Sequence, residues 1–358
     1  MQIIGVDLHT RQQRIAMLDT ETGELVEKTL QHEGEEVREF YSALTGSVQV
    51  GLQASGSMHW FLELLEELGI DYRVGHPSQI RKAETRKQKH DRRDAALLLK
   101  LQVEKRFPSI WMPASELRDL RTLRRQCHPW VRIRTRVPNT LQAMALSHGL
   151  RRGKTVWSQA GQHGMASLPL PLHTAYRRSE LQHWYDQLQG PIDERDKRVS
   201  AQAWQRAGDR LLLTHPGVGP VTALASDVFL GDAGRFADGK AVASYVRMIP
   251  REDSRGGRQR LGGLSKQGNP LLRFLWCEAA LHVVRRDPEL QRFYRRKLAA
   301  KGWGKARVAA ARKLAIRLGI LLRDQIDYPE FCRRGQLRQK SGATGAGTPD
   351  VGHSPAIL

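Results

Sequence analysis

The chain has 358 residues and a formal net charge of +21, with 58 lysines and arginines against 37 acidic residues. This length predicts two domains or three smaller ones. Like charges repel in a compact state, so the excess of positive charge indicates a partner that carries many phosphates. The sequence has no apolar run of about 18 residues and no signal-peptide pattern, so we expect neither a membrane protein nor a secreted one.

The three cysteines are far apart and odd in number, which predicts neither a disulfide framework nor a cysteine metal site. We therefore expect the reducing environment of the cytoplasm.

The first 112 residues predict an α/β domain, because strand and helix patterns alternate along them. The order is three strands joined by two hairpin turns, then helix, strand, helix, strand and helix, which predicts a sheet with an antiparallel start and a parallel continuation. The strands are expected in 1–30, 47–53 and 70–75, and the helices in 34–46, 58–69 and after His76.

Residues 113–208 predict a helical, coiled-coil-like arm with a dense arginine face. Pro129 and Pro138 are expected to interrupt its first helix, and a loop is expected near 150–175. Helical spacing resumes from 177 to 206.

Residues 209–335 predict a second, mainly helical domain, with helices at 270–285 and 304–324. Residues 336–358 are rich in Gly, Ser and Pro and predict a disordered tail.

Three aspartates indicate a metal site. Asp7 lies in the apolar segment IIGVDLH, where a carboxylate is costly unless it is paired or bound to a cation. Asp91 and Asp94 stand three residues apart at the start of a helical pattern, so both project from one face. Mg²⁺ prefers oxygen ligands, and two such ions can stabilise both oxygens of a phosphoryl transfer. The alternatives are a turn cap for Asp7 and neutralisation of a helix N-terminus by the pair.

The segment THPGVGPVTALAS (214–226) matches a helix–hairpin–helix pattern. Gly217 and Gly219 would let the backbone approach a phosphate, which the N–H groups of the following helix would bind. A tight turn between two core helices is the alternative.

The segment PREDSRGGRQRLGGLSKQGNP (250–270) places serines among arginines and glycines. Ser254 could attack a phosphodiester while the arginines stabilise the charge that develops. The alternative is a flexible basic loop that holds a nucleic-acid backbone. In either case the expected nucleic-acid contacts are Arg255, Arg258, Arg260 and Lys266. Basic residues interleaved with aromatic ones at 118–136 and 285–313 also predict nucleic-acid contact.

Taken together, GVDLH, ASGSMHWFLELLEELG, KQKHDRRDA, HPGVGPVTA and LLRFLWCEAA resemble segments of the DEDD-type insertion-sequence transposases. These are related to the Piv DNA invertases and include the bridge-RNA-guided recombinases. The resemblance implies a RuvC-like ribonuclease H fold over 1–112, a helical arm over 113–208 and a C-terminal transposase domain over 209–335. It also implies Mg²⁺ held by Asp, Glu, Asp and Asp, and a nucleophilic serine in the C-terminal domain.

By this resemblance Asp7, Asp91 and Asp94 are three of the four metal ligands, and Gln53 stands where the family has glutamate. A glutamine offers a neutral oxygen only, so the site loses one negative charge. The family also has a serine next to the glycines where this chain has Arg255, which leaves Ser254 as the nearby serine. We therefore expect a recombinase whose copy here is catalytically impaired.

The implied partners are the DNA of the element ends and of the target, a non-coding guide RNA and further copies of the chain, as a dimer or tetramer. The expected place is the bacterial cytoplasm, with the nucleoid. Two alternatives use the same residues differently: a RuvC-like, structure-selective nuclease would need the acidic site alone, and a nucleic-acid-binding protein would need neither site.

Overall fold

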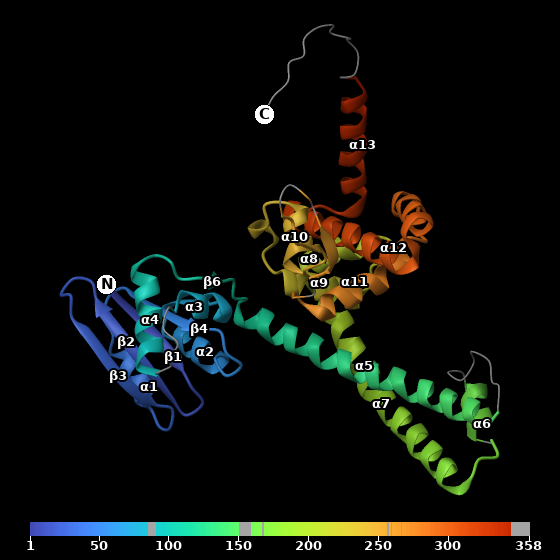
Figure 1. Ribbon diagram of the computed structural model, residues 1–358, viewed down its shortest axis with the longest axis horizontal. Coiled ribbons are helices and arrows are strands. Elements are labelled where there is room, and N and C mark those ends of the chain that lie inside the picture. The colour runs from blue at the N-terminus through green and yellow to red at the C-terminus, as the bar shows by residue number, and fades with distance from the viewer. Residues whose placement is uncertain are drawn as a thin grey trace. The chain divides into compact units, whose positions relative to one another are not determined.

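The computed structural model describes residues 1–84, 91–149, 159–166, 168–255, 258, 260–265 and 267–344. The chain divides into two compact units, Met1–Ser115 and Glu116–Leu358, and each is described here by itself (Figure 1). In these described ranges no helix combines the length and the apolar character needed to cross a bilayer.

The first unit is built on a six-stranded sheet with the strand order β3-β2-β1-β4-β5-β6. The first three strands pair antiparallel, and β4 and β5 continue the sheet parallel to β1, which confirms the predicted change of direction. The short β6 pairs antiparallel with β5 and was not predicted. The strands are β1 (Gln2–Leu8), β2 (Gln12–Asp19), β3 (Leu25–Gln31), β4 (Val48–Gln53), β5 (Asp71–Gly75) and β6 (Ser109–Ile110).

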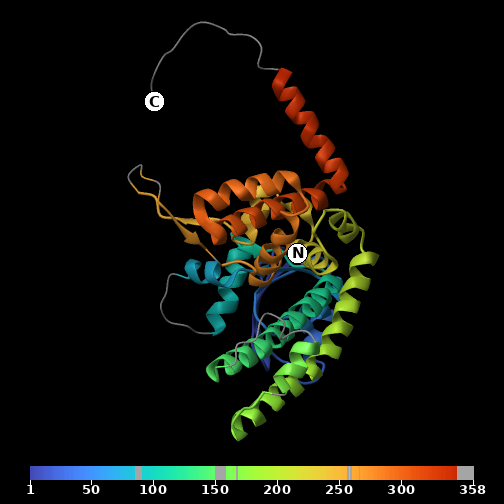
Figure 2. The same cartoon turned by 90° about the vertical axis from the view of Figure 1, so that its right-hand side faces the viewer.

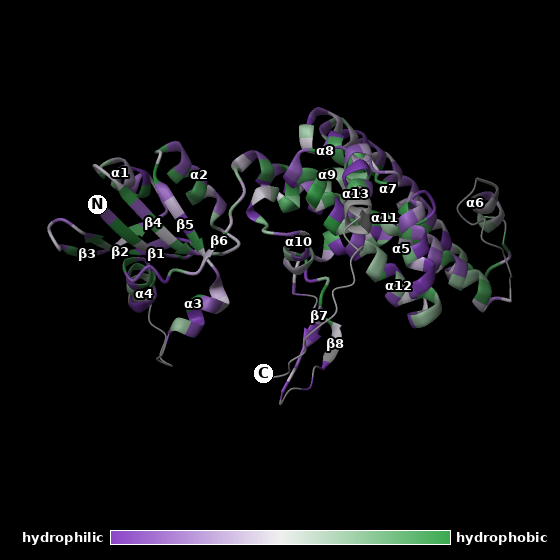
Figure 3. Cartoon of the chain, turned by 90° about the horizontal axis from the view of Figure 1, so that it is seen from above, coloured by the Kyte–Doolittle hydropathy of each residue, from purple (hydrophilic) through white to green (hydrophobic). Residues whose placement is uncertain are grey.

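Helices cover both faces of this sheet (Figure 3). On one face, α1 (Glu36–Ser42) and α2 (His59–Glu67) bury large apolar side chains of the strands, such as Ile4 and Leu52, against Phe61. On the other face lie α3 (Pro77–Ala83) and α4 (Asp91–Val103), where the contact at β2 is made by small residues such as Ala16. This mixed α/β unit is consistent with the expected ribonuclease H-like domain.

Helix α4 lies directly on the backbone of β1 because Gly5 has no side chain. A Cβ on Gly5 would lie 2.3 Å from the carbonyl oxygen of Ala95 and 2.4 Å from the amide nitrogen of Leu99. Farther along α4, the Gln102 amide donates to the carbonyl oxygen of Ile4 at 2.9 Å. The helix therefore runs antiparallel to β1, and its first turn lies at the end of β1 where Asp7 stands.

The segment that the sequence predicts as an arm contains three described helices: α5 (Ser115–Ser147), α6 (Gln159–Ala166) and α7 (Leu172–Gln205). Helix α5 continues through Pro129 and Pro138, so the predicted interruption was wrong. Each proline removes one helix hydrogen bond, but α5 is held by its packing, for example of Leu141 against Met165 in α6. Helix α6 and the start of α7 occupy part of the expected loop near 150–175.

The rest of the second unit packs around α9 (Pro220–Leu230), in which every residue from Thr222 onward is buried. The fully buried Trp276 donates from its indole N–H to Ser226 Oγ at 2.9 Å. The surrounding elements are α8 (Ala207–Leu213), the 3-10 helix η2 (Ala233–Arg235), α10 (Gly239–Tyr245), β7 (Pro250–Glu252), β8 (Leu261–Leu264), α11 (Pro270–Val283), α12 (Pro288–Asp324) and α13 (Tyr328–Thr344).

The expected disordered tail begins inside a helix, because α13 continues to Thr344. The remainder of that segment, 345–358, lies outside the described residues.

The contact of α4 with β1 predicts a strong effect of one added methyl group. We expect Gly5→Ala to lower the free energy of unfolding by about 1–3 kcal/mol, because the new Cβ meets backbone atoms that cannot rotate away. Gly56→Ala is the matched control, since nothing lies within 4 Å of a Cβ there. Urea unfolding of both variants tests the expectation, and equal midpoints would contradict it.

Candidate functional site

Asp7 and Gln53 occupy equivalent positions at the ends of neighbouring parallel strands. Val6 of β1 is in register with Leu52 of β4, so Asp7 and Gln53 are the next residues along each strand. Side chains alternate between the faces of a sheet. Gly5 and Gly51, two residues earlier, both face α4, where their added Cβ atoms would meet it. Asp7 and Gln53 therefore project on the same face, toward the side that α4 covers.

Asp94 reaches this edge from the first turn of α4. It directly precedes Ala95, whose carbonyl oxygen lies over Gly5, and its side chain is half-buried. Helix α4 is described from Asp91 onward, and the Asp91 side chain lies outside the described residues. The fold thus brings Asp7, Gln53 and Asp94 to one edge of the sheet.

Two basic side chains lie beside Asp7 that the sequence analysis missed. His9 Nε2 lies 3.0 Å from Asp7 Oδ2. Arg14 on β2 is in register with Asp7, and paired residues on antiparallel strands share a face. Its Nε is buried and has no hydrogen-bond partner among the described residues. His9 could have been noticed from its spacing to Asp7, whereas Arg14 could not be found without the register of the hairpin.

The donor atoms at this edge suit a hard cation. Asp7 and Asp94 offer carboxylate oxygens and Gln53 offers a carbonyl oxygen, and Mg²⁺ takes such ligands while it keeps several waters. The described side chains contain no group of three or more His, Cys, Asp or Glu placed to hold a metal. Gln53 contributes no charge, and Arg14 adds a positive one nearby. The edge therefore fits Mg²⁺ chemically, with less negative charge than four carboxylates would give.

Ser254 follows strand β7 in the two-stranded hairpin that β7 and β8 form. Strands β7 and β8 pair antiparallel, and Arg255 and Arg258 form a further bridge beyond them. The Ser254 hydroxyl donates to Glu252 Oε1 at 2.8 Å, and the Arg260 N–H donates to Ser254 Oγ at 3.4 Å. Glu252 was missed in the sequence, although residues two apart on a strand share a face.

The surroundings of Ser254 are basic and open to solvent. The described arginines nearest in sequence are all exposed: Arg251, Arg255, Arg258 and Arg260. Figure 3 shows β7 and β8 extending away from the helices of the second unit. Lys266, the remaining expected contact, lies outside the described residues. A phosphodiester that reached Ser254 would meet several guanidinium groups, which stabilise developing negative charge.

The segment 214–219 joins α8 to α9, but Gly217 packs against the protein itself. Its φ of +89° favours glycine, and a Cβ there would lie 2.9 Å from the amide nitrogen of Val283 in α11. Helix packing therefore explains Gly217, as in the alternative of a tight turn between core helices. At Gly219, which precedes α9, nothing lies within 4 Å of a Cβ.

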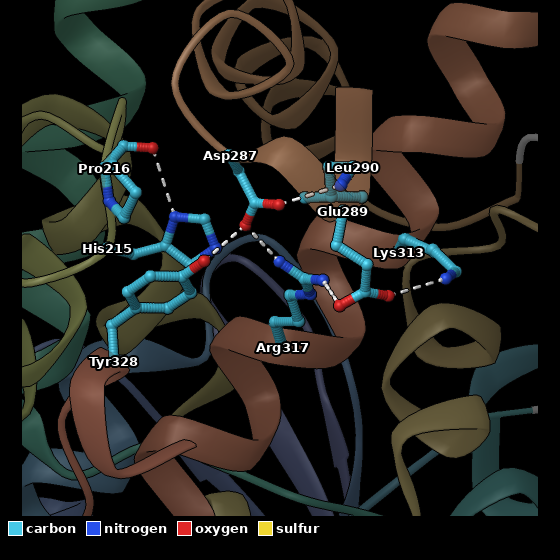
Figure 4. A network of polar contacts seen from close by, with 8 residues as sticks. All are labelled: His215, Pro216, Asp287, Glu289, Leu290, Lys313, Arg317 and Tyr328. Carbon is cyan, nitrogen blue, oxygen red and sulfur yellow. Dashed lines mark hydrogen bonds and ion pairs between the residues drawn. The ribbon is translucent and has the colours of Figure 1, made fainter. Parts of the chain in front are cut away.

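A buried polar network holds the same segment in place (Figure 4). The rings of His215 and Tyr328 lie 4.3 Å apart, and the Tyr328 N–H donates to Thr214 Oγ1 at 2.9 Å. The Tyr328 hydroxyl donates to Asp287, which also forms an ion pair with the buried Arg317. Burial lowers the pKa of His215 to about 4, so the imidazole is neutral near pH 7. His215, Asp287 and Arg317 are buried and Tyr328 is half-buried, so these groups stabilise the turn from within the fold.

Comparisons with known proteins match both units of the chain. Residues 4–148 match the DEDD transposase model of IS110 elements, and residues 209–295 match the transposase IS116/IS110/IS902 family. A probable family 20 transposase of Pseudomonas aeruginosa PAO1 is 30% identical over 70% of this chain and 75% of its own length. The transposase for insertion sequence element IS1111A of Coxiella burnetii is 24% identical over 80% of this chain and 82% of its own. The transposase for insertion sequence element IS1328 of Yersinia enterocolitica is 24% identical over 66% of this chain and 71% of its own.

Proposed function

Since the chain belongs to the IS116/IS110/IS902 family of transposases, we propose that it cuts and rejoins DNA at the ends of an insertion sequence and at a target site. The observation that carries this proposal is the arrangement of Asp7, Gln53 and Asp94 at one edge of the sheet, which is suited to a cation acting on phosphate. The net charge of +21 supports a nucleic-acid substrate.

In this proposal Asp7, Gln53, Asp91 and Asp94 hold Mg²⁺ in the first unit. The bound ion would neutralise charge on the scissile phosphate as it reacts. His9 keeps the Asp7 carboxylate oriented through the 3.0 Å contact. The Arg14 charge and the neutral Gln53 both weaken the attraction of this edge for a cation.

In the second unit Ser254 would form a covalent bond with DNA. Its hydroxyl oxygen attacks the phosphorus, and the proton passes to Glu252, which already accepts a hydrogen bond from it. The bond from phosphorus to one sugar oxygen breaks, and that oxygen leaves as a hydroxyl after it takes up a proton. Rejoining reverses these steps with the hydroxyl of another strand end, so the sequence of bond changes balances without a further reactant.

Two features of the acidic edge support an impaired copy. Gln53 supplies no charge where the family has a carboxylate, and Arg14 lies in register with Asp7. A chain with this edge would still fold and bind DNA. The alternatives remain a structure-selective nuclease, which would not need Ser254, and a binding protein, which would not cleave at all.

Restoring the missing charge should raise metal affinity. We expect Gln53→Glu to bind Mn²⁺ or Mg²⁺ roughly tenfold more tightly in calorimetry, because the site gains one charged ligand. Cleavage of supercoiled DNA carrying the element ends, with the flanking RNA supplied, should rise in parallel, and further in the double variant Gln53→Glu with Arg255→Ser. If the unaltered protein already cleaves as fast as both variants, the impaired-copy hypothesis is wrong.

The hairpin geometry predicts separate roles for Ser254 and Glu252. These roles are measured in the unaltered protein if it cleaves, and otherwise in the Gln53→Glu variant. Ser254→Ala should abolish the covalent protein–DNA adduct seen on denaturing gels, and Glu252→Gln should slow its formation by about 10²–10⁴-fold. Asp253→Asn is the matched control, since it removes the same charge from the neighbouring residue. Cleavage that survives Ser254→Ala would favour the structure-selective nuclease instead.

We also propose that the protein works as a homo-oligomer with a non-coding guide RNA, as the family resemblance implies. If acidic sites and serines from different copies act together, mixing Asp7→Ala protein with Ser254→Ala protein should restore part of the cleavage that each variant lacks. Mixing should restore none if every copy acts alone. Omitting the RNA from the mixture should remove the activity, and activity without it would argue against the guide.

A further inference from the structure

We propose that a groove between α12 and the β7–β8 hairpin binds a single strand of DNA, with its phosphates along a row of lysines and a base against an apolar floor. This α12 groove has a volume of about 700 Å³ and lies within the second unit. It deepens the proposed function, because the strand that it would hold is the one presented to Ser254. Figure 2 shows the hairpin leaving the helices beside α12.

The wall formed by α12 carries uncompensated positive charge. Lys297, Lys301 and Lys305 follow one another at intervals of four, with the bend of the helix at Gly302 between the last two. Lys240 and Arg312 add two further cations, and no acidic side chain lines the groove. Within the described part of the chain these five cations form no ion pair. Such a row is costly for the protein alone and suits a polyanion.

The floor of the groove is apolar and includes an aromatic ring. Leu264, Val308 and Ile316 line it together with Phe293. The ammonium groups of Lys297 and Lys313 lie 5.6 and 4.6 Å from the centre of the Phe293 ring. Lysines above an apolar floor with an aromatic ring provide the two components of single-strand recognition, which are backbone charge and base stacking.

Glycines on both walls keep the groove open. Gly263 of β8 and Gly304 of α12 line it, and nothing lies within 4 Å of a Cβ built on either. The protein's own packing therefore does not require glycine at these positions. The space that their missing side chains leave is part of the groove. We therefore infer that glycine at these positions leaves room for the bound strand.

The floor favours an unpaired strand over a duplex. In a duplex the bases are stacked inside and only their edges are exposed, so Phe293 and Leu264 would gain no stacking contact. We propose DNA as the occupant, because the groove is formed by the same hairpin that carries Ser254. RNA in this groove would place the wrong chain beside that hydroxyl.

Binding of labelled oligothymidylate of about 12 nucleotides, followed by fluorescence anisotropy, tests the proposal with the full chain. We expect Gly263→Val to weaken binding about tenfold by filling the groove, without a change in the thermal unfolding midpoint. Lys301→Ala and Lys305→Ala should each lower the slope of log affinity against log salt by about 0.7. Arg296→Ala, on the same helix but outside the groove, is the matched control and should affect binding less.

A second experiment, photo-cross-linking, tests whether a base of the bound strand lies against Phe293. An oligonucleotide carrying 5-iododeoxyuridine should photo-cross-link to Phe293, and Phe293→Leu should abolish that cross-link while the protein stays folded. Oligouridylate and duplex DNA of the same length should bind the wild type and Gly263→Val equally. Two results would overturn the assignment. One is that Gly263→Val loses as much affinity for oligouridylate or duplex DNA as it does for oligothymidylate. The other is that Gly263→Val binds oligothymidylate as tightly as the wild type does.

These tests are independent of cleavage. Ser254→Ala should bind oligothymidylate as the wild type does. If the groove variants bind normally and the protein cuts DNA, the groove assignment fails and the proposed function stands. If they lose binding and the protein never cuts, the groove assignment stands and the proposed chemistry fails.

Discussion

The backbone contact between α4 and β1 is the constraint on which the acidic site depends. Because Gly5 and Gly51 present no side chain, α4 can lie against the sheet at the distance of backbone atoms. Its first turn then stands over the edge where β1 and β4 end, and Asp94 reaches the side on which Asp7 and Gln53 project. A larger residue at Gly5 would displace the helix backbone and separate Asp94 from Asp7 and Gln53, and one at Gly51 would displace the Gln102 amide that holds α4 to Ile4. Two residues with no functional group therefore determine the geometry of this edge.

In the second unit, several basic residues that look available for nucleic acid serve the fold instead. Arg121 donates from Nε to the carbonyl oxygen of Val228 at 2.7 Å, and Arg235 donates from Nη2 to that of Leu230 at 3.0 Å. Both lie at the C-terminal end of the buried helix α9, where free carbonyls and the helix dipole favour cations. Arg317 is buried against Asp287. The net charge therefore overstates the number of side chains free to contact phosphate.

The sequence predicted best where local pattern decides the structure. The hairpins of β1–β3 and the helix that carries Asp91 and Asp94 follow from alternation, turn residues and spacing. The interruption predicted at Pro129 and Pro138 was wrong, because packing along α5 offsets the helix hydrogen bonds that the prolines remove. Gly217 was assigned to phosphate because a turn glycine looks the same whether it faces solvent or, as here, the backbone of α11. Arg14 gains its meaning from strand register, which the sequence does not contain. Glu252 lies only two residues before Ser254, so that spacing could have shown it.

The two departures that the family resemblance implies, Gln53 and Arg255, lie in different units. In our proposal both affect the cleavage chemistry and neither affects the binding surfaces. Gln53 changes the charge at the metal edge without changing the strand that carries it, because glutamine and glutamate have nearly the same shape. Arg255 adds a cation beside Ser254, where a phosphodiester would be attracted more strongly. The α12 groove, with its lysines and its open glycines, is unaffected by either change. If the proposed sites are correct, a chain altered in this way would keep its affinity for DNA after its cleavage rate had fallen, because the residues that bind the strand and the residues that carry the chemistry are different.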